Sequence, residues 1–491
     1  MNRLLYPLVF VAGAGTMATE MSASRLLAPF FGASILIWAN IIGLILIYLS
    51  IGYFWGGRIA DRHPSIRFMC ALIMIAAVSI AVIPFIAEPL LSRAVSAFAA
   101  LSVGAFLGSF FASMALFSIP ITLLGMVSPF AVRLGVDSVE RAGEVAGRLY
   151  ALSTAGSIFG TFLPVVFLIP FIGTRRTMLA TAGVLGLGAA AGLGRRYVLV
   201  PAVVAVIALI PPGLIKPGPG VIWEGESAYQ FIQVQKIPDH GRVLHLNEGW
   251  AEHSVWYPHR VLTGGYWDQF LLAPLLHGPG LRSLAMIGYA GGTVGRQYGV
   301  FWPNVNVLGI EIDPTVTAIG RRYFGLDSNP RVRVATADGR PYLATHATRY
   351  DAIFMDAFTQ PYIPFYLTTQ EFWRLAQSRL RPRGMVMANV GTIPGSEQLP
   401  NAIGGTMATV FPYVYRWRIS GFNELVVGFD RPVSQAQLDA RVSAAPSRLQ
   451  PAAHLAETLT RQAPSTDPMT DDRAPIEWIT DQLILRFAGG P

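Results

Sequence analysis

The sequence is poor in charge and in cysteine. Only 13% of its 491 residues are Asp, Glu, Lys or Arg, roughly half the share that is usual in soluble domains. Cys70 is its single cysteine, which excludes an internal disulfide and a thiol-ligated metal site. Basic residues form no stripe with interleaved aromatic residues, so the net charge of +8 does not indicate a nucleic-acid surface. We expect no metal and no nucleic-acid partner.

Long apolar runs fill the first half of the chain. Hydrophobic residues make up 52% of the sequence, and its mean hydropathy is +0.45. A helix needs about 20 mostly apolar residues to cross a bilayer, so residues 1–215 are predicted to form a multi-span α-helical membrane domain with the lipid bilayer as its partner. About seven spans are expected, at residues 4–24, 35–57, 67–87, 95–117, 146–169, 177–194 and 197–213.

Arginine clusters indicate the orientation of these spans. They follow the second, fourth and sixth spans, at Arg58, Arg62 and Arg67, at Arg133, Arg141 and Arg148, and at Arg195 and Arg196. Loops rich in Arg and Lys lie on the cytoplasmic side, here of the inner (plasma) membrane. An odd number of full spans would put the C-terminal half on the opposite side. A further apolar segment, 118–134, contains Pro120 and Pro129 and either extends the fourth span or crosses separately.

The second half of the chain has the pattern of a water-soluble α/β domain. Residues 216–227 are rich in Pro and Gly and are expected to be a linker. Residues 228–265 are expected to form a small β subdomain built on a hairpin of strands 228–234 and 242–247. In residues 266–487, expected strands alternate with helical stretches, which is typical of a parallel, doubly wound, Rossmann-like sheet. These strands are 283–287, 305–310, 331–335, 351–355 and 384–390.

Glycines and acids follow the expected strands in a fixed order. A glycine turn at Gly288, Gly291 and Gly292 comes after the first strand, and Glu311 ends the second about 20 residues later. A strand, a glycine turn, a helix and a strand ending in an acid is the pattern of a nucleoside-binding half-fold. The ordered series of acids is completed by Asp338 after the third strand and Asp356 after the fourth. Glu311 could then accept both hydroxyls of a ribose, and Asp338 could meet an adenine amino group.

These residues carry a family resemblance. Residues 226–390 resemble the polyamine aminopropyltransferases, the spermidine synthase family. The matching segments are Tyr229-Gln230, Gly264-Gly265-Tyr266-Trp267-Asp268, Glu311-Ile312-Asp313, Ala337-Asp338-Gly339, Tyr350 to Asp356 and Leu367 to Phe372. The whole chain is similar to bacterial fusions of a multi-span membrane region to a spermidine-synthase-like domain. The resemblance implies a Rossmann-like domain of the class I S-adenosylmethionine type.

The resemblance also assigns roles to the donor side of the site. It implies that decarboxylated S-adenosylmethionine, or S-adenosylmethionine itself, binds as co-substrate without a metal. Gln230 would touch its nucleoside or sulfonium side, Glu311 its ribose and Asp338 its adenine. Gly288, Gly291 and Gly339 complete the expected cofactor-binding set.

On the acceptor side the resemblance implies three catalytic residues, Tyr266, Asp268 and Asp356. Tyr266 and Asp268 would line a pocket for an amine or polyamine, and Asp356 would sit beside the sulfonium carbon that is attacked. Two positions depart from the family pattern. An acid that grips the donor's amino group is replaced by Gly291, and a second acid of the catalytic loop is replaced by Thr359. These losses weaken the case for ordinary putrescine chemistry.

Three functions therefore remain in view. The first is a membrane-anchored aminopropyltransferase that releases methylthioadenosine. Such an enzyme could be a homodimer or a monomer. The second is a methyltransferase or another enzyme that consumes S-adenosylmethionine in the same pocket. The third is a transporter whose soluble domain senses a polyamine or nucleoside. We expect the soluble domain in the cytoplasm, where these compounds are made, so either 197–213 does not cross fully or 118–134 does.

Overall fold

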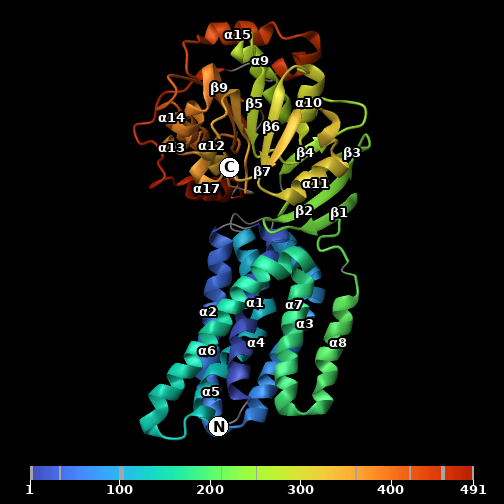
Figure 1. The fold of residues 1–491 in the computed structure, drawn as a ribbon, viewed down its shortest axis with the longest axis vertical. Coiled ribbons are helices and arrows are strands. Elements are labelled where there is room, and N and C mark those ends of the chain that lie inside the picture. The colour runs from blue at the N-terminus through green and yellow to red at the C-terminus, as the bar shows by residue number, and fades with distance from the viewer. Residues whose placement is uncertain are drawn as a thin grey trace. The chain divides into compact units, whose positions relative to one another are not determined.

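The computed structural model describes residues 4–32, 35–98, 104–211, 213–249, 251–359, 362–419, 422–454 and 459–488. The chain divides into two compact units. The first comprises Met1–Gly218 and Glu224–Phe231, and the second comprises Pro219–Trp223 and Ile232–Pro491. The first is helical and the second is an α/β unit (Figure 1).

Long helices make up the first unit. They are α1 (Leu5–Phe31), α2 (Ile35–Arg62), α3 (Ile66–Phe98), α4 (Gly104–Gly125), α5 (Val127–Gly135), α6 (Ala142–Leu163), α7 (Ile169–Leu193) and α8 (Leu199–Leu209), with short turns η1 (Val139–Arg141), η2 (Pro164–Leu168) and η3 (Arg195–Val198). Glycines let two of these helices approach closely. A Cβ atom on Gly156 would lie 2.1 Å from the Phe10 carbonyl oxygen, and one on Gly160 would lie 2.0 Å from that of Ala14. Such small-residue contacts replace the hydrophobic driving force that is absent in lipid.

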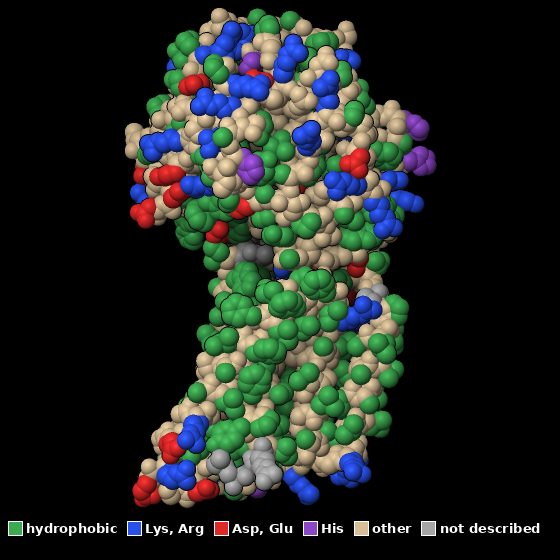
Figure 2. Space-filling model, in the orientation of Figure 1, with side chains coloured by type: hydrophobic (Ala, Val, Ile, Leu, Met, Phe, Trp, Pro, Cys, Tyr) green, Lys and Arg blue, Asp and Glu red, His purple; other side chains and the backbone are tan. Residues whose placement is uncertain are grey.

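Four stretches of the described helices are long and apolar enough to cross a membrane. They are Ile35–Arg62, Ile66–Phe98, Phe106–Gly135 and Val139–Leu193. Apolar side chains cover much of the visible surface of the helical unit (Figure 2). The last helix, α8, has 11 residues and is therefore about 16 Å long, about half of the hydrocarbon thickness. The full count of spans stays a prediction.

A small antiparallel sheet begins the α/β part of the chain. Its order is β1-β2-β3-β4, with β1 (Val221–Glu226), β2 (Phe231–Ile237), β3 (Gly241–Leu246) and β4 (Glu252–Trp256). The expected hairpin is the β2–β3 pair. Strand β1 lies in the segment 216–227 that was expected to be a linker, so this Pro- and Gly-rich segment also contributes an outer strand.

The main sheet has eight strands in the order β12-β10-β11-β9-β8-β5-β6-β7. They are β5 (Ser283–Ile287), β6 (Asn306–Glu311), β7 (Val332–Thr336), β8 (Tyr350–Met355), β9 (Leu380–Gly391), β10 (Tyr413–Arg418), β11 (Asn423–Phe429) and β12 (Thr460–Arg461). Strands β5 to β9 are parallel, which confirms the Rossmann-like fold. Strands β10 to β12 extend it antiparallel. These antiparallel strands were not predicted from the sequence, and β10 and β11 form a hairpin across a short connection.

Helices flank this sheet. They are η4 (Tyr266–Leu272), α9 (Ala273–His277), α10 (Thr293–Phe301), α11 (Pro314–Tyr323), η5 (Leu326–Ser328), α12 (Gly339–Thr345), η6 (Phe365–Leu367), α13 (Gln370–Ser378), α14 (Gln398–Met407), α15 (Gln435–Ser443), η7 (Ser447–Leu449), α16 (Gln450–His454) and α17 (Ile476–Ala488). Successive strand residues point to opposite faces, so β8 contributes to two core clusters. Phe354 packs with Phe270 in one of them, and Ile353 packs with Trp373 in the other. Burial on both faces explains the continuous apolar strand sequences.

Candidate functional site

Three strand ends converge at Gly288. Its N–H donates to the Ile310 carbonyl at 3.0 Å, and the Asp356 N–H donates to the Ile287 carbonyl at 2.9 Å. Gly288 has φ +78°, and a Cβ atom there would lie 2.4 Å from the Asp356 backbone oxygen. Only glycine tolerates both the left-handed conformation and this close approach. The ends of β5, β6 and β8 are thereby brought together.

Glu311 anchors the glycine loop. Its side chain is 6% exposed and accepts hydrogen bonds from the backbone N–H groups of Ala290 at 2.8 Å and Asp313 at 3.0 Å. Burial raises the pKa of this carboxyl to about 7. Each carboxylate oxygen has more than one acceptor site, so Glu311 can hold the loop and still accept ribose hydroxyls.

Asp338 and Gly339 begin helix α12 at the end of β7. The Asp338 carboxylate caps this helix by accepting from the Arg340 N–H at 3.1 Å, and it also accepts from the Tyr366 hydroxyl at 3.0 Å. A Cβ atom on Gly339 would lie 2.3 Å from Cγ2 of Ile287, so glycine lets α12 pack against β5. Both residues therefore lie at the edge of the sheet where the strands end, which is where the predicted cofactor site lies.

The glycine loop contains a buried tyrosine whose ring packs against neighbouring elements. Tyr289 is 2% exposed. A Cβ atom on Gly309 of β6 would lie 2.4 Å from its ring, and one on Gly295 of α10 would lie 1.7 Å from its hydroxyl. The two glycines leave the space that this ring occupies. The loop Gly288–Gly292 is thus fixed by packing as well as by Glu311.

Asp356 directly follows β8, and it lines a pocket. Asn389 donates to its Oδ1 at 2.8 Å, and the Tyr266 hydroxyl also hydrogen-bonds to it. Burial outweighs these two interactions and raises the pKa of Asp356 to about 7. A carboxylate with this pKa is suited to accept a proton near neutral pH. The pocket is lined by His253, Ser254, Tyr266, Trp267, Met286, Gly288, Tyr289, Ala290, Thr293, Val294 and Asp356.

Sequence reasoning missed Asn389 as a site residue. It lies on β9, and its Oδ1 accepts a hydrogen bond at 3.1 Å from Nδ2 of Asn423 on β11. The available signal was a single amide within the otherwise apolar run Met385-Val386-Met387-Ala388-Asn389-Val390. A buried polar side chain of this kind needs a partner, and Asp356 is that partner.

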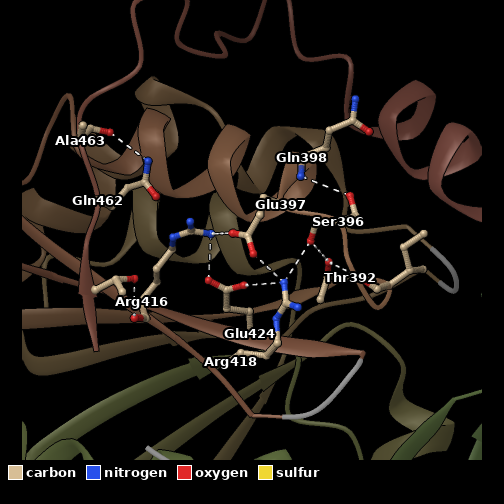
Figure 3. A network of polar contacts seen from close by, with 11 residues as sticks. Thr392, Ser396, Glu397, Gln398, Arg416, Arg418, Glu424, Gln462 and Ala463 are labelled. Carbon is tan, nitrogen blue, oxygen red and sulfur yellow. Dashed lines mark hydrogen bonds and ion pairs between the residues drawn. The ribbon is translucent and has the colours of Figure 1, made fainter. Parts of the chain in front are cut away.

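An ion-pair network lies beside Asn423, the residue that hydrogen-bonds to Asn389 (Figure 3). Glu424, adjacent to Asn423 on β11, is 3% exposed and accepts from Nη1 of Arg416 at 3.0 Å. Glu397 pairs with the same Nη1 atom at 2.5 Å and with Arg418 at 2.7 Å. The buried carboxylate is thus compensated by two guanidinium groups. We infer that the network fixes the register of β10 and β11 behind Asn389.

Asp268 is a buried carboxylate that accepts several hydrogen bonds. It is 3% exposed, and its Oδ1 accepts from the N–H of Thr263 at 3.0 Å and from Nε2 of Gln297 at 2.5 Å. Its Oδ2 accepts from the N–H of Gly264 at 2.8 Å. These bonds hold the turn before Tyr266 against α10. Asp268 is not among the described residues that line the pocket, so this geometry gives no support to its catalytic assignment.

Comparison with known proteins agrees with this geometry. No family model matches the sequence. The chain is 31% identical to the polyamine aminopropyltransferase of Vibrio vulnificus over 248 residues, which cover 47% of this chain and 79% of that protein. The chain belongs to the polyamine aminopropyltransferase family. It is also 34% identical over 190 residues to a probable polyamine aminopropyl transferase of Bifidobacterium longum, covering 38% of this chain and 42% of that protein.

Membership of the aminopropyltransferase family confirms the family resemblance seen in the sequence and the prediction of a transferase. The chain spans less than half of the length of the Bifidobacterium relative. Among solved structures, a probable spermidine synthase from Corynebacterium glutamicum matches with a TM-score of 0.40 and 18% identity, covering 52% of this chain and all of that one.

The two departures from the aminopropyltransferase pattern have a structural basis. At Gly291, a Cβ atom would lie 2.9 Å from Oγ of Ser254, which accepts the Gly291 N–H at 2.8 Å. Thr359 is exposed and exchanges two backbone hydrogen bonds with Tyr362. Neither position leaves an acid pointing into the pocket. At Gly291, the neighbouring Ser254 occupies the space that a side chain would need.

Gln230 lies just before β2, and its N–H donates to Oγ of Ser227 at 3.1 Å. It belongs to the segment Glu224–Phe231 that groups with the helical unit. It is not among the described residues that line the Asp356 pocket. Its contact with the cofactor stays a prediction.

Proposed function

We propose that the α/β unit transfers an aminopropyl group from decarboxylated S-adenosylmethionine to an amine. One observation carries this proposal: a loop anchored by Glu311, suited to a nucleoside, opens on the same pocket as the half-buried carboxylate of Asp356. Membership of the aminopropyltransferase family supports the same reaction. Glu311 would hold the ribose and Asp338 the adenine.

In the proposed reaction, the lone pair of the acceptor nitrogen attacks the propyl carbon bonded to the sulfonium. A C–N bond forms while the C–S bond breaks, and the electron pair of that bond neutralises the sulfur to give methylthioadenosine. The nitrogen loses one proton to the Asp356 carboxylate, which passes it to water. Orientation of the two substrates supplies much of the acceleration, and the Tyr266 hydroxyl holds Asp356 toward the acceptor.

A methyltransferase is the second candidate. The observation that favours it is the neutral contact between Ser254 and Gly291. Without an acid at that point, the carboxylate of S-adenosylmethionine would meet less repulsion than in a site built for its decarboxylated form. Calorimetric titration with the two donors separates these candidates. Tighter binding of S-adenosylmethionine, with release of S-adenosylhomocysteine, would favour methyl transfer.

The nucleoside assignment is tested by Glu311→Gln. Replacing one carboxylate oxygen by an amide leaves a ribose hydroxyl poorly paired, which costs about 1–3 kcal/mol. Methylthioadenosine affinity should fall roughly 10- to 100-fold. Asp439→Asn, a change of an exposed acid on α15, should leave it unchanged. Equal affinity of the wild type and Glu311→Gln would remove the basis of the nucleoside assignment.

We propose further that the helical unit anchors the enzyme in the inner membrane with the α/β unit in the cytoplasm. Support comes from the four long apolar stretches and from the arginines toward the C-terminal ends of helices α2 and α5, namely Arg58, Arg62 and Arg133. The acceptor and donor are cytosolic compounds, so this orientation supplies the substrates directly.

A further inference from the structure

Strand β4 carries an irregularity beside the Asp356 pocket. Leu244 of β3 pairs with Ser254, whereas the next residue, His245, pairs with Glu252, so His253 is an extra residue in the ladder. A β-bulge of this kind re-aims a side chain and is common next to active sites. As a result, two consecutive residues, His253 and Ser254, both line the pocket, whereas regular alternation would turn one of them away.

Ser254 makes one wall of the pocket neutral. Its Oγ accepts the Gly291 N–H at 2.8 Å and would lie 2.9 Å from a Cβ atom at position 291. No side chain can project from position 291 while Ser254 keeps this place. The hydroxyl therefore occupies a point of the wall from which a charged group could otherwise reach the substrates.

His253 adds a second neutral group. Its Nε2 atom is buried and has no hydrogen-bond partner in the described part of the chain. Burial and the neighbouring His245 lower its pKa to about 3, so the imidazole is uncharged at neutral pH. A buried polar atom without a partner is costly, and a ligand group that pairs with it removes that cost. The adjacent Glu252 is exposed and does not line the pocket.

The charge of the pocket limits what can bind. Among the described lining residues, Asp356 supplies the one carboxylate. The proposed donor already brings a sulfonium and an ammonium. A diamine acceptor would add an ammonium at its far end, which would stay charged while the near nitrogen reacts. An ammonium taken out of water without a carboxylate partner is strongly disfavoured.

We propose that His253, together with Ser254, is a specificity-determining residue that selects an acceptor with one amine and a neutral hydrogen-bonding group. The neutral group, a hydroxyl or an amide, pairs with Nε2 of His253 while the amine faces Asp356. This inference rests on the proposed aminopropyl transfer and names its acceptor class.

A matched pair of acceptors tests this inference in the full-length, detergent-solubilised protein. Butane diamine and the amino alcohol in which a hydroxyl replaces one amine differ only at the far end. The wild type should prefer the amino alcohol by roughly tenfold or more in kcat/KM, because the buried hydroxyl is neutral, whereas an ammonium in its place would be buried without a carboxylate to balance its charge. His253→Ala should reduce kcat/KM for the amino alcohol about 10- to 100-fold, mainly through KM, with methylthioadenosine affinity unchanged.

Two further variants make the test decisive. His253→Gln keeps a neutral hydrogen-bonding group and should restore part of the amino-alcohol activity lost in His253→Ala. His253→Asp adds a carboxylate and should shift preference toward the diamine. A wild type that transfers to the diamine in preference, or a preference unchanged in His253→Asp, overturns the inference but leaves aminopropyl transfer intact. Transfer to neither acceptor would overturn the proposed transfer itself and the inference with it.

Discussion

At the scale of single residues, the chemistry depends on how Asp356 is held. Its half-buried carboxylate interacts with Tyr266 and Asn389, and the loss of hydration there raises its pKa to about 7. The deprotonated form is the base, so kcat/KM should rise with pH through about 7 and level off above it. A carboxylate with an ordinary pKa would already be fully ionised there and would give a flat profile.

Asp356→Asn should abolish turnover and preserve nucleoside binding. The amide cannot take the proton of the attacking nitrogen, so product formation should fall roughly 10²- to 10⁴-fold. Methylthioadenosine affinity, measured by calorimetry, should stay at the wild-type value because Glu311 and Asp338 make the proposed nucleoside contacts. Wild-type turnover in this variant would mean that another group carries the proton.

Asn389 should set the pKa of Asp356. Its hydrogen bond favours the charged carboxylate and so lowers the pKa that burial raises. In Asn389→Ala the pKa should therefore rise further, and the midpoint of the pH profile should move upward with a reduced rate at pH 7. Asn401→Ala, on the exposed side of α14, is the control. An unshifted midpoint in Asn389→Ala would show that this contact does not tune the base.

At the scale of elements, the nucleoside fold was predictable and its extension was not. Strands β5, β6 and β8 are short apolar runs, each ended or directly followed by a glycine or an acid, so their positions could be predicted from the sequence. Strands β10 and β11 lack such end signals. The bulge at His253 was also hidden, because a register shift depends on the partner strand and not on local sequence.

The convergence of β5 and β8 can be tested with two glycines of similar backbone conformation. Gly288 (φ +78°) would place a Cβ atom 2.4 Å from the Asp356 backbone, whereas Gly395 (φ +80°) would meet nothing within 4 Å. Both substitutions to Ala carry the cost of a left-handed residue, about 1 kcal/mol. Gly288→Ala should lower the melting temperature further and reduce turnover by displacing Asp356. Equal effects of the two variants on melting and turnover would contradict this account of the strand ends.

At the scale of the whole molecule, the sequence alone does not determine on which side of the membrane the C-terminal domain lies. The number of spans decides it, and apolar segments interrupted by proline leave that number open. Helix α8 has 11 residues, fewer than a crossing needs, which favours the first of the two alternatives, that 197–213 does not cross fully, over a separate crossing by 118–134. The domain type was easier to predict, because its motifs lie on consecutive strand ends.

We expect a reporter that works only in the cytoplasm to be active when it is fused to the C-terminus, and a reporter that works only in the periplasm to be inactive there. A second fusion after Arg62, in a loop predicted to be cytoplasmic, gives the reference signal. Equal cytoplasmic signals from the two fusions would support the proposed side. Periplasmic activity at the C-terminus would contradict it and would mean that the α/β unit uses an exported substrate.

The most direct test of aminopropyl transfer follows the carbon that moves. The purified protein is given decarboxylated S-adenosylmethionine labelled in its propyl chain, together with the amino alcohol and the diamine, and the products are resolved by mass spectrometry. The account predicts that the label appears on an acceptor nitrogen in amounts equal to the methylthioadenosine released, and that Asp356→Asn shows neither product. Label retained in the nucleoside product, with a methyl group gained by the acceptor, would contradict it.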